Sequence, residues 1–338
     1  MKKYLLASCI LLSLFAFRNN DRKKNRAVEI KMAISKSLSL LESSSHTFLI
    51  NAPVVTTCHS CHNNGLSLVT FSIAKENGFP VSDTIINEAV DSTMNWWKSE
   101  VYQQALPEND DPIATVMVGN YDLWGLSAIG YKSNKYVEGV SRNIMRKQTY
   151  DGSWVSPGQR PPLEYYSISA TALAIRNMQI YMPPILHNEV EQRIETARSW
   201  LLKNKPDANE EKVFQLLGLI WSHGDKTVIE QLAKKLLAAQ HNDGGWSQLD
   251  SLPTDAYATG QSLYALYQAG LLTVTTPSYQ KGVDFLLSSQ FPDGSWKVIT
   301  RSYPFQSYVN SGFPHEKDQF ISAAGSNWAT MALIPAAK

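Results

Sequence analysis

The stretch that decides the fold runs from Gln240 to Trp246 and reads Gln-His-Asn-Asp-Gly-Gly-Trp. The same phrase, Gln-x-x-Asp-Gly-[Ser/Gly]-Trp, recurs from Gln148 to Trp154 and from Gln290 to Trp296. The last two copies begin 50 residues apart, and the first two begin 92 residues apart, near twice that period. A fixed period of this length is typical of a chain built from repeated supersecondary units. One degenerate copy is therefore expected between the first two phrases.

Each phrase follows one helical pattern and precedes another. Residues 228–237, before the second phrase, carry an apolar stripe among Lys and Gln, which predicts an outer helix with one wet face. Residues 255–270, after it, are nearly free of charge, which predicts an inner helix packed on all sides. The phrase itself favours a helix stop, because Asp-Gly supplies turn chemistry and Trp can dock between neighbouring helices.

This alternation continues along the chain and predicts six outer and six inner helices. Outer helices are expected near residues 27–43, 82–104, 133–148, 187–204, 225–240 and 276–290. Inner helices are expected near residues 60–76, 113–131, 164–179, 208–222, 254–270 and 320–334. Six pairs can close into a ring that buries the inner faces around a central cavity. The expected fold class is all-α, an (α/α)6 toroid formed by residues 26–338 as a single domain.

The three phrases resemble the QW repeats of squalene-hopene cyclases, and the stretch from Asp255 to Gln261 resembles an inner helix of that superfamily. The resemblance covers most of residues 100–338. It implies an α/α toroid of the terpene cyclase and protein prenyltransferase type, with a pocket where the inner helices begin. A shared fold does not by itself establish a shared reaction.

The sequence departs from both enzyme classes. Class II terpene cyclases use the middle carboxyl of an Asp-x-Asp-Asp motif, and the nearest match here is Glu108-Asn109-Asp110-Asp111, which lacks the first Asp. The chain is also about half the length of a two-domain squalene-hopene cyclase, so cyclisation of squalene is not expected. Protein prenyltransferases hold zinc with Asp, Cys and His, but residues 243–255 contain no cysteine.

The N-terminal segment predicts export. Lys2 and Lys3 precede an apolar run from Tyr4 to Phe17, as in a signal peptide. No clear cleavage site follows, and several basic residues come after it, so residues 1–25 are expected to be a signal peptide or an N-terminal membrane anchor. The four residues ending at Cys9 also resemble a signal for lipid attachment. The expected location is the periplasm or the cell envelope.

Residues 58–62 read Cys-His-Ser-Cys-His, which is the CxxCH pattern of c-type haem attachment. Two thiols on one helical turn can reach both vinyl groups of the porphyrin, and the adjacent histidine can bind the iron. The pattern predicts covalent haem c at Cys58 and Cys61, with His62 as an iron ligand and His315 as the favoured sixth ligand. Zinc binding and a Cys58–Cys61 disulfide or redox dithiol are the alternatives.

Other candidate site residues are suggested by the predicted arrangement of the inner helices. If the inner helices are parallel, their first residues meet on one rim and would bring together Asp110, Glu164, Tyr165, Asp255, Tyr257, His315 and Asp318. Three of these carboxyls, Asp110, Asp255 and Asp318, are the candidate catalytic acids. Capping of a helix explains the same residues without any site, because acidic side chains favour helix N-termini. The long aromatic loop of residues 297–317 is expected to line the pocket or to close the ring.

Charge and composition limit the function. The 31 basic and 30 acidic side chains give a net charge of +1, which argues against nucleic acid as a partner. We expect electron transfer or haem-dependent redox chemistry on a small hydrophobic molecule, with a redox partner. A terpene cyclase-like lyase or isomerase, and a non-enzymatic toroid that binds an isoprenoid or a metal, are the alternatives. The sequence leaves open whether the protein is an enzyme.

Overall fold

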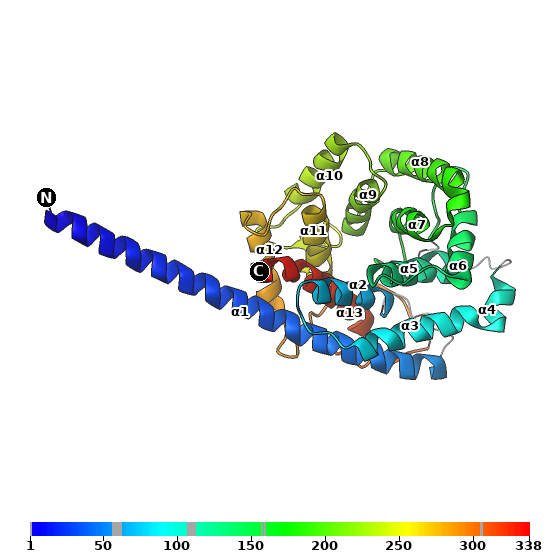
Figure 1. Ribbon diagram of the computed structural model, residues 1–338, viewed down its shortest axis with the longest axis horizontal. Helices are drawn as coiled ribbons and strands as arrows, with labels where there is room; N and C mark the ends of the chain where they lie inside the picture. The colour runs from blue at the N-terminus through cyan, green and yellow to red at the C-terminus, as the bar shows by residue number, and fades with distance from the viewer. Residues whose placement is uncertain (1, 56–62, 107–112, 157, 159, 305–306) are drawn as a thin grey trace.

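The computed structural model describes residues 2–55, 63–106, 113–156, 158, 160–304 and 307–338, and for residues 2–24, 55 and 113–115 it describes the backbone alone. Figure 1 shows an inner group of helices surrounded by an outer group, with the N-terminal half of α1 leading away from both. The predicted all-α toroid is confirmed, and the outer and inner helices alternate along the chain as expected.

The outer helices are α1 (Lys2–Val55), α3 (Asp83–Lys98), α6 (Lys135–Arg146), α8 (His187–Lys203), α10 (Lys226–Ala238) and α12 (Pro277–Ser289). The inner helices are α2 (Gly65–Glu76), α5 (Gly119–Ala128), α7 (Ser167–Tyr181), α9 (Asn209–Trp221), α11 (Ala256–Gln268) and α13 (Gln319–Leu333). Each inner helix contacts the inner helices before and after it, and α13 contacts α2. The inner ring is therefore closed.

Short elements lie between these helices or follow the last of them. They are α4 (Glu100–Ala105), the π-helix η1 (Ile113–Val118) and the 3-10 helices η2 (Pro184–Leu186), η3 (Glu316–Asp318) and η4 (Ile334–Ala337). Strands β1 (Trp246–Ser247) and β2 (Thr254–Asp255) pair antiparallel just before α11. Several boundaries differ from the prediction; the inner helix expected near residues 113–131, for example, is divided into η1 and α5. The first outer helix is one continuous helix from Lys2, and the second is divided at Ser99, whose side chain accepts a hydrogen bond from the Tyr102 backbone and so begins α4.

Each copy of the repeated phrase joins the outer helix before it to the neighbouring helices. In the second copy the Gln240 side chain donates to Gly244 O at 2.7 Å and to Ser278 O of the next outer helix at 2.8 Å. The Trp246 indole donates to Leu236 O at 2.8 Å, and the Trp246 backbone donates to the inner-helix hydroxyl of Thr259 at 2.9 Å. One phrase thus joins two outer helices and one inner helix, which explains why its residue types repeat.

The third phrase closes the outer ring. The Gln290 side chain donates to Ala33 O of α1 at 3.0 Å, across 257 residues of sequence. Thr330 of α13 adds a hydrogen bond of 2.8 Å to Ser37 of α1. The first outer helix therefore occupies the position that a seventh outer helix would take in an open solenoid.

Aromatic side chains occupy the middle of the inner ring. The ring centroid of Trp124 in α5 lies 5.8 Å from that of Trp328 in α13 and 6.4 Å from that of Phe214 in α9. Tyr264 of α11 lies 5.5 Å from Trp328, and Trp221 lies 5.8 Å from Trp124. We call these five residues the aromatic plug. At this level the space expected to be a central cavity is filled by side chains from four inner helices.

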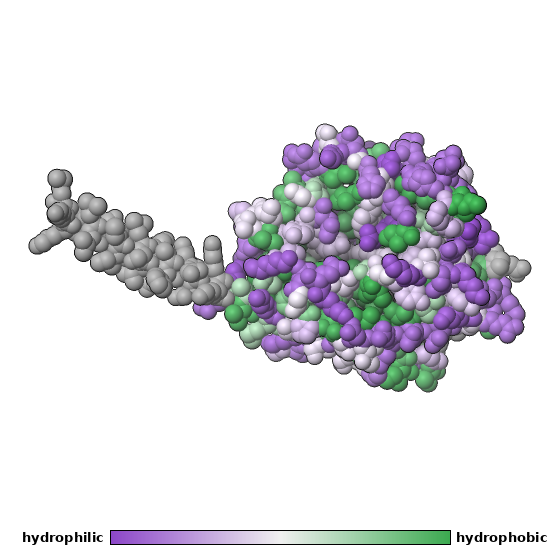
Figure 2. Space-filling view, viewed as in Figure 1, coloured by the Kyte–Doolittle hydropathy of each residue, from purple (hydrophilic) through white to green (hydrophobic). Residues whose placement is uncertain are grey.

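The outer surface is mostly hydrophilic on the face shown in Figure 2, where hydrophobic residues form small separate areas. Within the part of the chain that the structure describes, no helix has the length and hydrophobicity needed to cross a membrane.

Candidate functional site

The first residues of α9 and α11 lie side by side on one rim of the toroid. Hydrogen bonds connect them: the Asn209 backbone at the start of α9 donates to Gln248 O at 3.0 Å, and Gln248 donates to Asp255 before α11 at 2.9 Å. We call this side the N-terminal rim. It is the positive end of these helix dipoles, where buried acidic groups and anions are favoured.

Glu210, the second residue of α9, is the most unusual group on this rim. Its residue is 2% exposed, and its Oε2 accepts hydrogen bonds from the Tyr257 hydroxyl at 2.8 Å and from the Gln261 amide at 2.6 Å. Its Oε1 has no hydrogen-bond partner among the described residues. Burial raises the pKa of this carboxyl to about 8, against the opposing hydrogen bonds from Gln261 and Tyr257. At neutral pH Glu210 therefore holds a proton in a site shielded from water.

The turn before α9 fixes Glu210 in place. The Glu211 side chain accepts hydrogen bonds of 3.1 Å from the backbone N–H groups of Asp207 and Ala208. This bonding satisfies two amides that a helix N-terminus leaves without partners. Consecutive glutamates thus have separate tasks, because Glu211 turns outward to cap the helix while Glu210 faces the inner ring.

Asp255, a predicted candidate acid, is the N-cap of α11. Its Oδ1 accepts from the Ala258 backbone at 2.8 Å and its Oδ2 from the Gln248 amide at 2.9 Å. Surrounding protein atoms raise the pKa of the Asp255 carboxyl to about 6, although these two hydrogen bonds oppose the rise. Both carboxyl oxygens are engaged, and the Gln248 amide is held in one orientation as a result.

Asp318 and His315, two further predicted residues, lie beside α13. Asp318 is 4% exposed, and its Oδ1 accepts from the Thr300 backbone at 2.9 Å. The His315 Nε2 lies 2.8 Å from the Ser295 hydroxyl, and its ring packs edge-on against Phe291. Burial lowers the pKa of His315, while the charge of Asp293 opposes that change. His315 therefore contacts the third phrase and not the Glu210 cluster.

The remaining predicted residues divide into two groups. Tyr257 is buried and bonded to Glu210, as given above, while Glu164 is fully buried and paired with Arg160, and Tyr165 is 43% exposed. Cys58, Cys61, His62 and Asp110 lie outside the described residues. Among the residues that are described, no cluster of three or more His, Cys, Asp or Glu side chains could hold a metal ion.

Arg301, which the sequence analysis did not single out, lies over this cluster. Its Nε donates to Gln248 Oε1 at 2.9 Å, and its charge lowers the pKa values of both Glu210 and Asp255. It comes from the long loop that was expected to line the pocket. Glu210 was also missed, although the Glu-Glu pair at the start of a nearly uncharged inner helix was a signal that could have indicated it.

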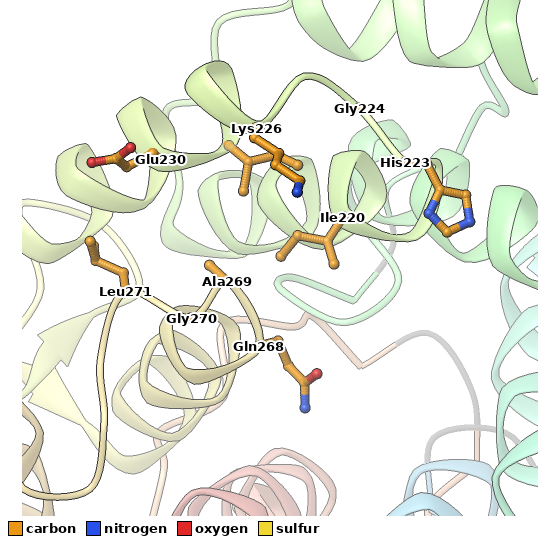
Figure 3. Close-up of a pocket in the computed structure, with 10 residues that line it drawn as sticks. Ile220, His223, Gly224, Lys226, Glu230, Gln268, Ala269, Gly270 and Leu271 are labelled. Carbon is orange, nitrogen blue, oxygen red and sulfur yellow. The ribbon is translucent and has the colours of Figure 1, made fainter.

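A surface pocket of about 590 Å³ lies at the other end of α9 and α11 (Figure 3). Ile220 and Ala269 contribute apolar lining, and Lys226 and Glu230 extend from α10. Glu210 and Ile220 stand at opposite ends of α9, about 15 Å apart at 1.5 Å per residue. The pocket is therefore separate from the N-terminal rim, and none of the predicted site residues lines it.

The sequence matches no family model. Over 107 residues, 31% of this chain, it is 33% identical to lanosterol synthase from Candida albicans, and over 113 residues, 30% of the chain, it is 32% identical to the terpene cyclase-glycosyl transferase fusion protein fsoA from Humicola fuscoatra. These matches span 14% and 8% of the two relatives' own lengths.

Solved structures match nearly the whole chain. The type II terpene cyclase MstE from Scytonema superposes with a TM-score of 0.54 at 12% identity, covering 90% of this chain and 98% of that one. A protein from Actinoplanes has a TM-score of 0.54 at 13% identity, covering 89% and 100%. At these identities the structures show the fold alone. The fold is the α/α toroid seen in the type II terpene cyclases, and about a third of the sequence is similar to the curated relatives.

Proposed function

We propose that this protein is a terpene cyclase-like enzyme of the isomerase or lyase type, which transfers a proton to and from an isoprenoid at the N-terminal rim. Glu210 is the proposed acid. The observation that carries the proposal is its buried carboxyl, protonated at neutral pH, with Oε1 free of partners among the described residues. A proton donor with a pKa near the working pH suits general acid–base transfer.

The proposed double-bond shift conserves protons, so it needs no further reactant. In a double-bond shift Glu210 gives its proton to one carbon and the resulting carboxylate takes a proton from another. Tyr257 and Gln261, which donate to the same oxygen, stabilise that carboxylate while it exists. Asp255 and Asp318 are weaker candidates for the acid, because each already accepts a backbone N–H hydrogen bond that fixes a helix start or a loop.

Deuterium exchange tests this proposal. The full chain is incubated with geranylgeraniol in D2O, and the recovered lipid is analysed by mass spectrometry. We expect incorporation of deuterium with the wild type and at least a hundredfold loss with Glu210→Gln. Glu230→Gln, on the outer helix α10, is the matched control and should leave incorporation unchanged. Wild-type exchange that survives Glu210→Gln would overturn the role of Glu210.

A second candidate function rests on the CxxCH motif at residues 58–62. In this alternative we propose that the protein is an exported c-type haem protein with a role in electron transfer. Cys58 and Cys61 would attach the haem, and His62 would bind its iron. Its test is the visible spectrum and intact mass of the denatured full-length protein, produced with a cytochrome c maturation system. A Soret band and the mass gain of one haem, both lost in His62→Ala, are expected. Unmodified mass would contradict it and make zinc content the next measurement.

A further inference from the structure

The far end of the inner ring, opposite the N-terminal rim, holds an unpaired arginine. Arg176 belongs to α7, and its guanidinium carbon lies 5.2 Å from the centre of the Trp221 ring. Trp221 is the last residue of α9 and lies about 16 Å from Glu210 along the helix axis, at 1.5 Å per residue. Arg176 therefore packs on the part of the aromatic plug that is far from the proposed acid.

No described residue neutralises the charge of Arg176. Within the described part of the chain it makes no ion pair or hydrogen bond, and its Nε is buried without a partner. The nearby groups Tyr264 and Tyr181 are neutral phenols, because burial raises both of their pKa values. By contrast, Arg193 and Arg198 of α8 each pair with a glutamate. Charges held away from water are normally paired, so a negative partner of Arg176 is missing.

Solvent reaches this part of the ring from its far end. Arg176, Trp221 and Tyr264 all belong to inner helices, yet each keeps part of its surface exposed. A pocket of about 210 Å³ opens at the same end, and its lining includes Tyr264, Met331 and Ile73. Arg176 is a neighbour of this pocket, since its charge opposes the burial that raises the pKa of Tyr264. The far end therefore combines a small pocket, apolar in part, with an adjacent cation.

These features limit the chemistry of a ligand. A carboxylate matches the planar guanidinium in a bidentate manner, and an aromatic ring packs well against Trp221 or Tyr264. The C-terminal ends of the inner helices carry negative partial charge here, and Glu76 also lines the pocket, so a ligand with several negative charges is disfavoured. The pocket is smaller than the roughly 300–1,000 Å³ usual for drug-sized molecules, so the ligand is small.

We infer that Arg176 and the far side of the aromatic plug form a binding site for a small aromatic monocarboxylate. The Arg176 guanidinium binds the carboxylate, and the aromatic ring of the ligand packs against Tyr264 and the apolar lining of the pocket. The site is separate from Glu210, so the inference does not depend on the proposed function. A ligand here contacts side chains of several inner helices and stabilises the closed ring when it binds.

The test compares three probes of similar size and different charge. The full-length protein is titrated calorimetrically with benzoate, with its neutral amide benzamide, and with benzylamine, which is a cation at neutral pH. We expect benzoate to bind at least tenfold more tightly than either of the other probes. Equal binding of benzoate and benzamide, or no binding of benzoate, would overturn the inference without any variant.

Variants assign the effect to Arg176. In Arg176→Gln the affinity for benzoate should fall at least tenfold, whereas Arg176→Lys, which keeps the charge and loses the planar fork, should retain part of it. Arg142→Gln, which removes an exposed arginine paired with Glu138 on the outer helix α6, is the matched control and should bind as the wild type does. Glu210→Gln should also bind normally, because it lies at the other end of the ring. Unchanged binding in Arg176→Gln would overturn the inference.

Thermal unfolding without ligand separates binding from a structural role. A charge without a partner costs stability, so Arg176→Met, which removes the charge and keeps an apolar side chain, should leave the unfolding midpoint unchanged or higher. Arg193→Met should lower the midpoint, because Arg193 is bonded to Glu189 and Gln148. A fall in Arg176→Met as large as that in Arg193→Met would assign Arg176 a structural role and overturn the inference.

Discussion

At the scale of single residues, the chemistry of the rim depends on environment more than on residue type. Glu210 and Glu211 are adjacent and identical, yet one is buried against Tyr257 and Gln261 and the other caps its own helix. The partners of Glu210 lie 47 and 51 residues away in sequence. Only the closed ring brings them together, so no local pattern could distinguish the two glutamates.

The burial of Glu210 predicts a pH-dependent stability. The unfolded carboxyl loses its proton near its ordinary pKa of 4.5, whereas the folded one keeps it to about 8. Between these values the folded state binds more protons, so the free energy of unfolding falls as pH rises. Glu210→Gln should remove a slope of up to ~1.4 kcal/mol per pH unit, measured by urea unfolding from about pH 7 to about pH 8, where Asp255 has already lost its proton. Glu230→Gln should retain the slope, and a wild-type curve that is flat over this range would contradict the prediction.

At the scale of elements, the repeated phrase explains why the helices could be predicted. Asp243 accepts from the Gly245 backbone at 3.0 Å, and Gly244 adopts a φ of +94°, so the chain turns within two residues. These contacts are local, and they leave a sequence signature that recurs in each copy. The outer and inner helices were predictable for this reason, whereas the start of α1 and the break at Ser99 have no comparable signal.

Gly244 offers a sharp test of the phrase. A Cβ at this position would lie 2.4 Å from Lys281 O of the next outer helix, and the positive φ adds strain. Gly270 also has a positive φ, of +70°, but a Cβ there would meet nothing within 4 Å. Gly270→Ala should therefore cost about 1 kcal/mol in unfolding free energy, and Gly244→Ala clearly more, on the order of 3 kcal/mol. Equal losses in thermal or chemical unfolding would show that the contact with Lys281 is unimportant.

At the scale of the whole molecule, two sets of contacts close the toroid. The third phrase joins α12 to α1 in the outer ring, and α13 contacts α2 in the inner ring. The number of pairs and the low charge of the inner helices predicted this closure. They did not predict what fills the middle, because the aromatic plug depends on which faces of four helices meet at the axis. Arg301 was missed for a related reason, since its contact with Gln248 depends on the path that residues 296–301 take over the rim.

The aromatic plug should hold the inner ring together. Trp328 is fully buried and contacts Trp124, Phe214 and Tyr264 from three other inner helices. Trp328→Ala should lower the unfolding free energy by ~3–5 kcal/mol, because it removes a large buried side chain and leaves a cavity. Trp200→Ala, which removes a partly exposed tryptophan from the outer helix α8, should lower it much less. Similar losses for both, measured by chemical unfolding, would exclude a central role for the plug.

The closure of the outer ring by Gln290 also dictates an order of assembly. The segment of α1 around Ala33 and Ser37 finds its partners 257 and 293 residues further along the chain. Contacts of such separation form late, because the entropy of closing a long loop must be overcome first. During synthesis the part of α1 that packs against α12 and α13 therefore stays uncovered until those helices have been made, although α2 and α3 can contact α1 earlier. We expect a folding intermediate in which the later pairs are stacked and α1 is not yet docked on α12 and α13, a species prone to association and suited to protection by a chaperone.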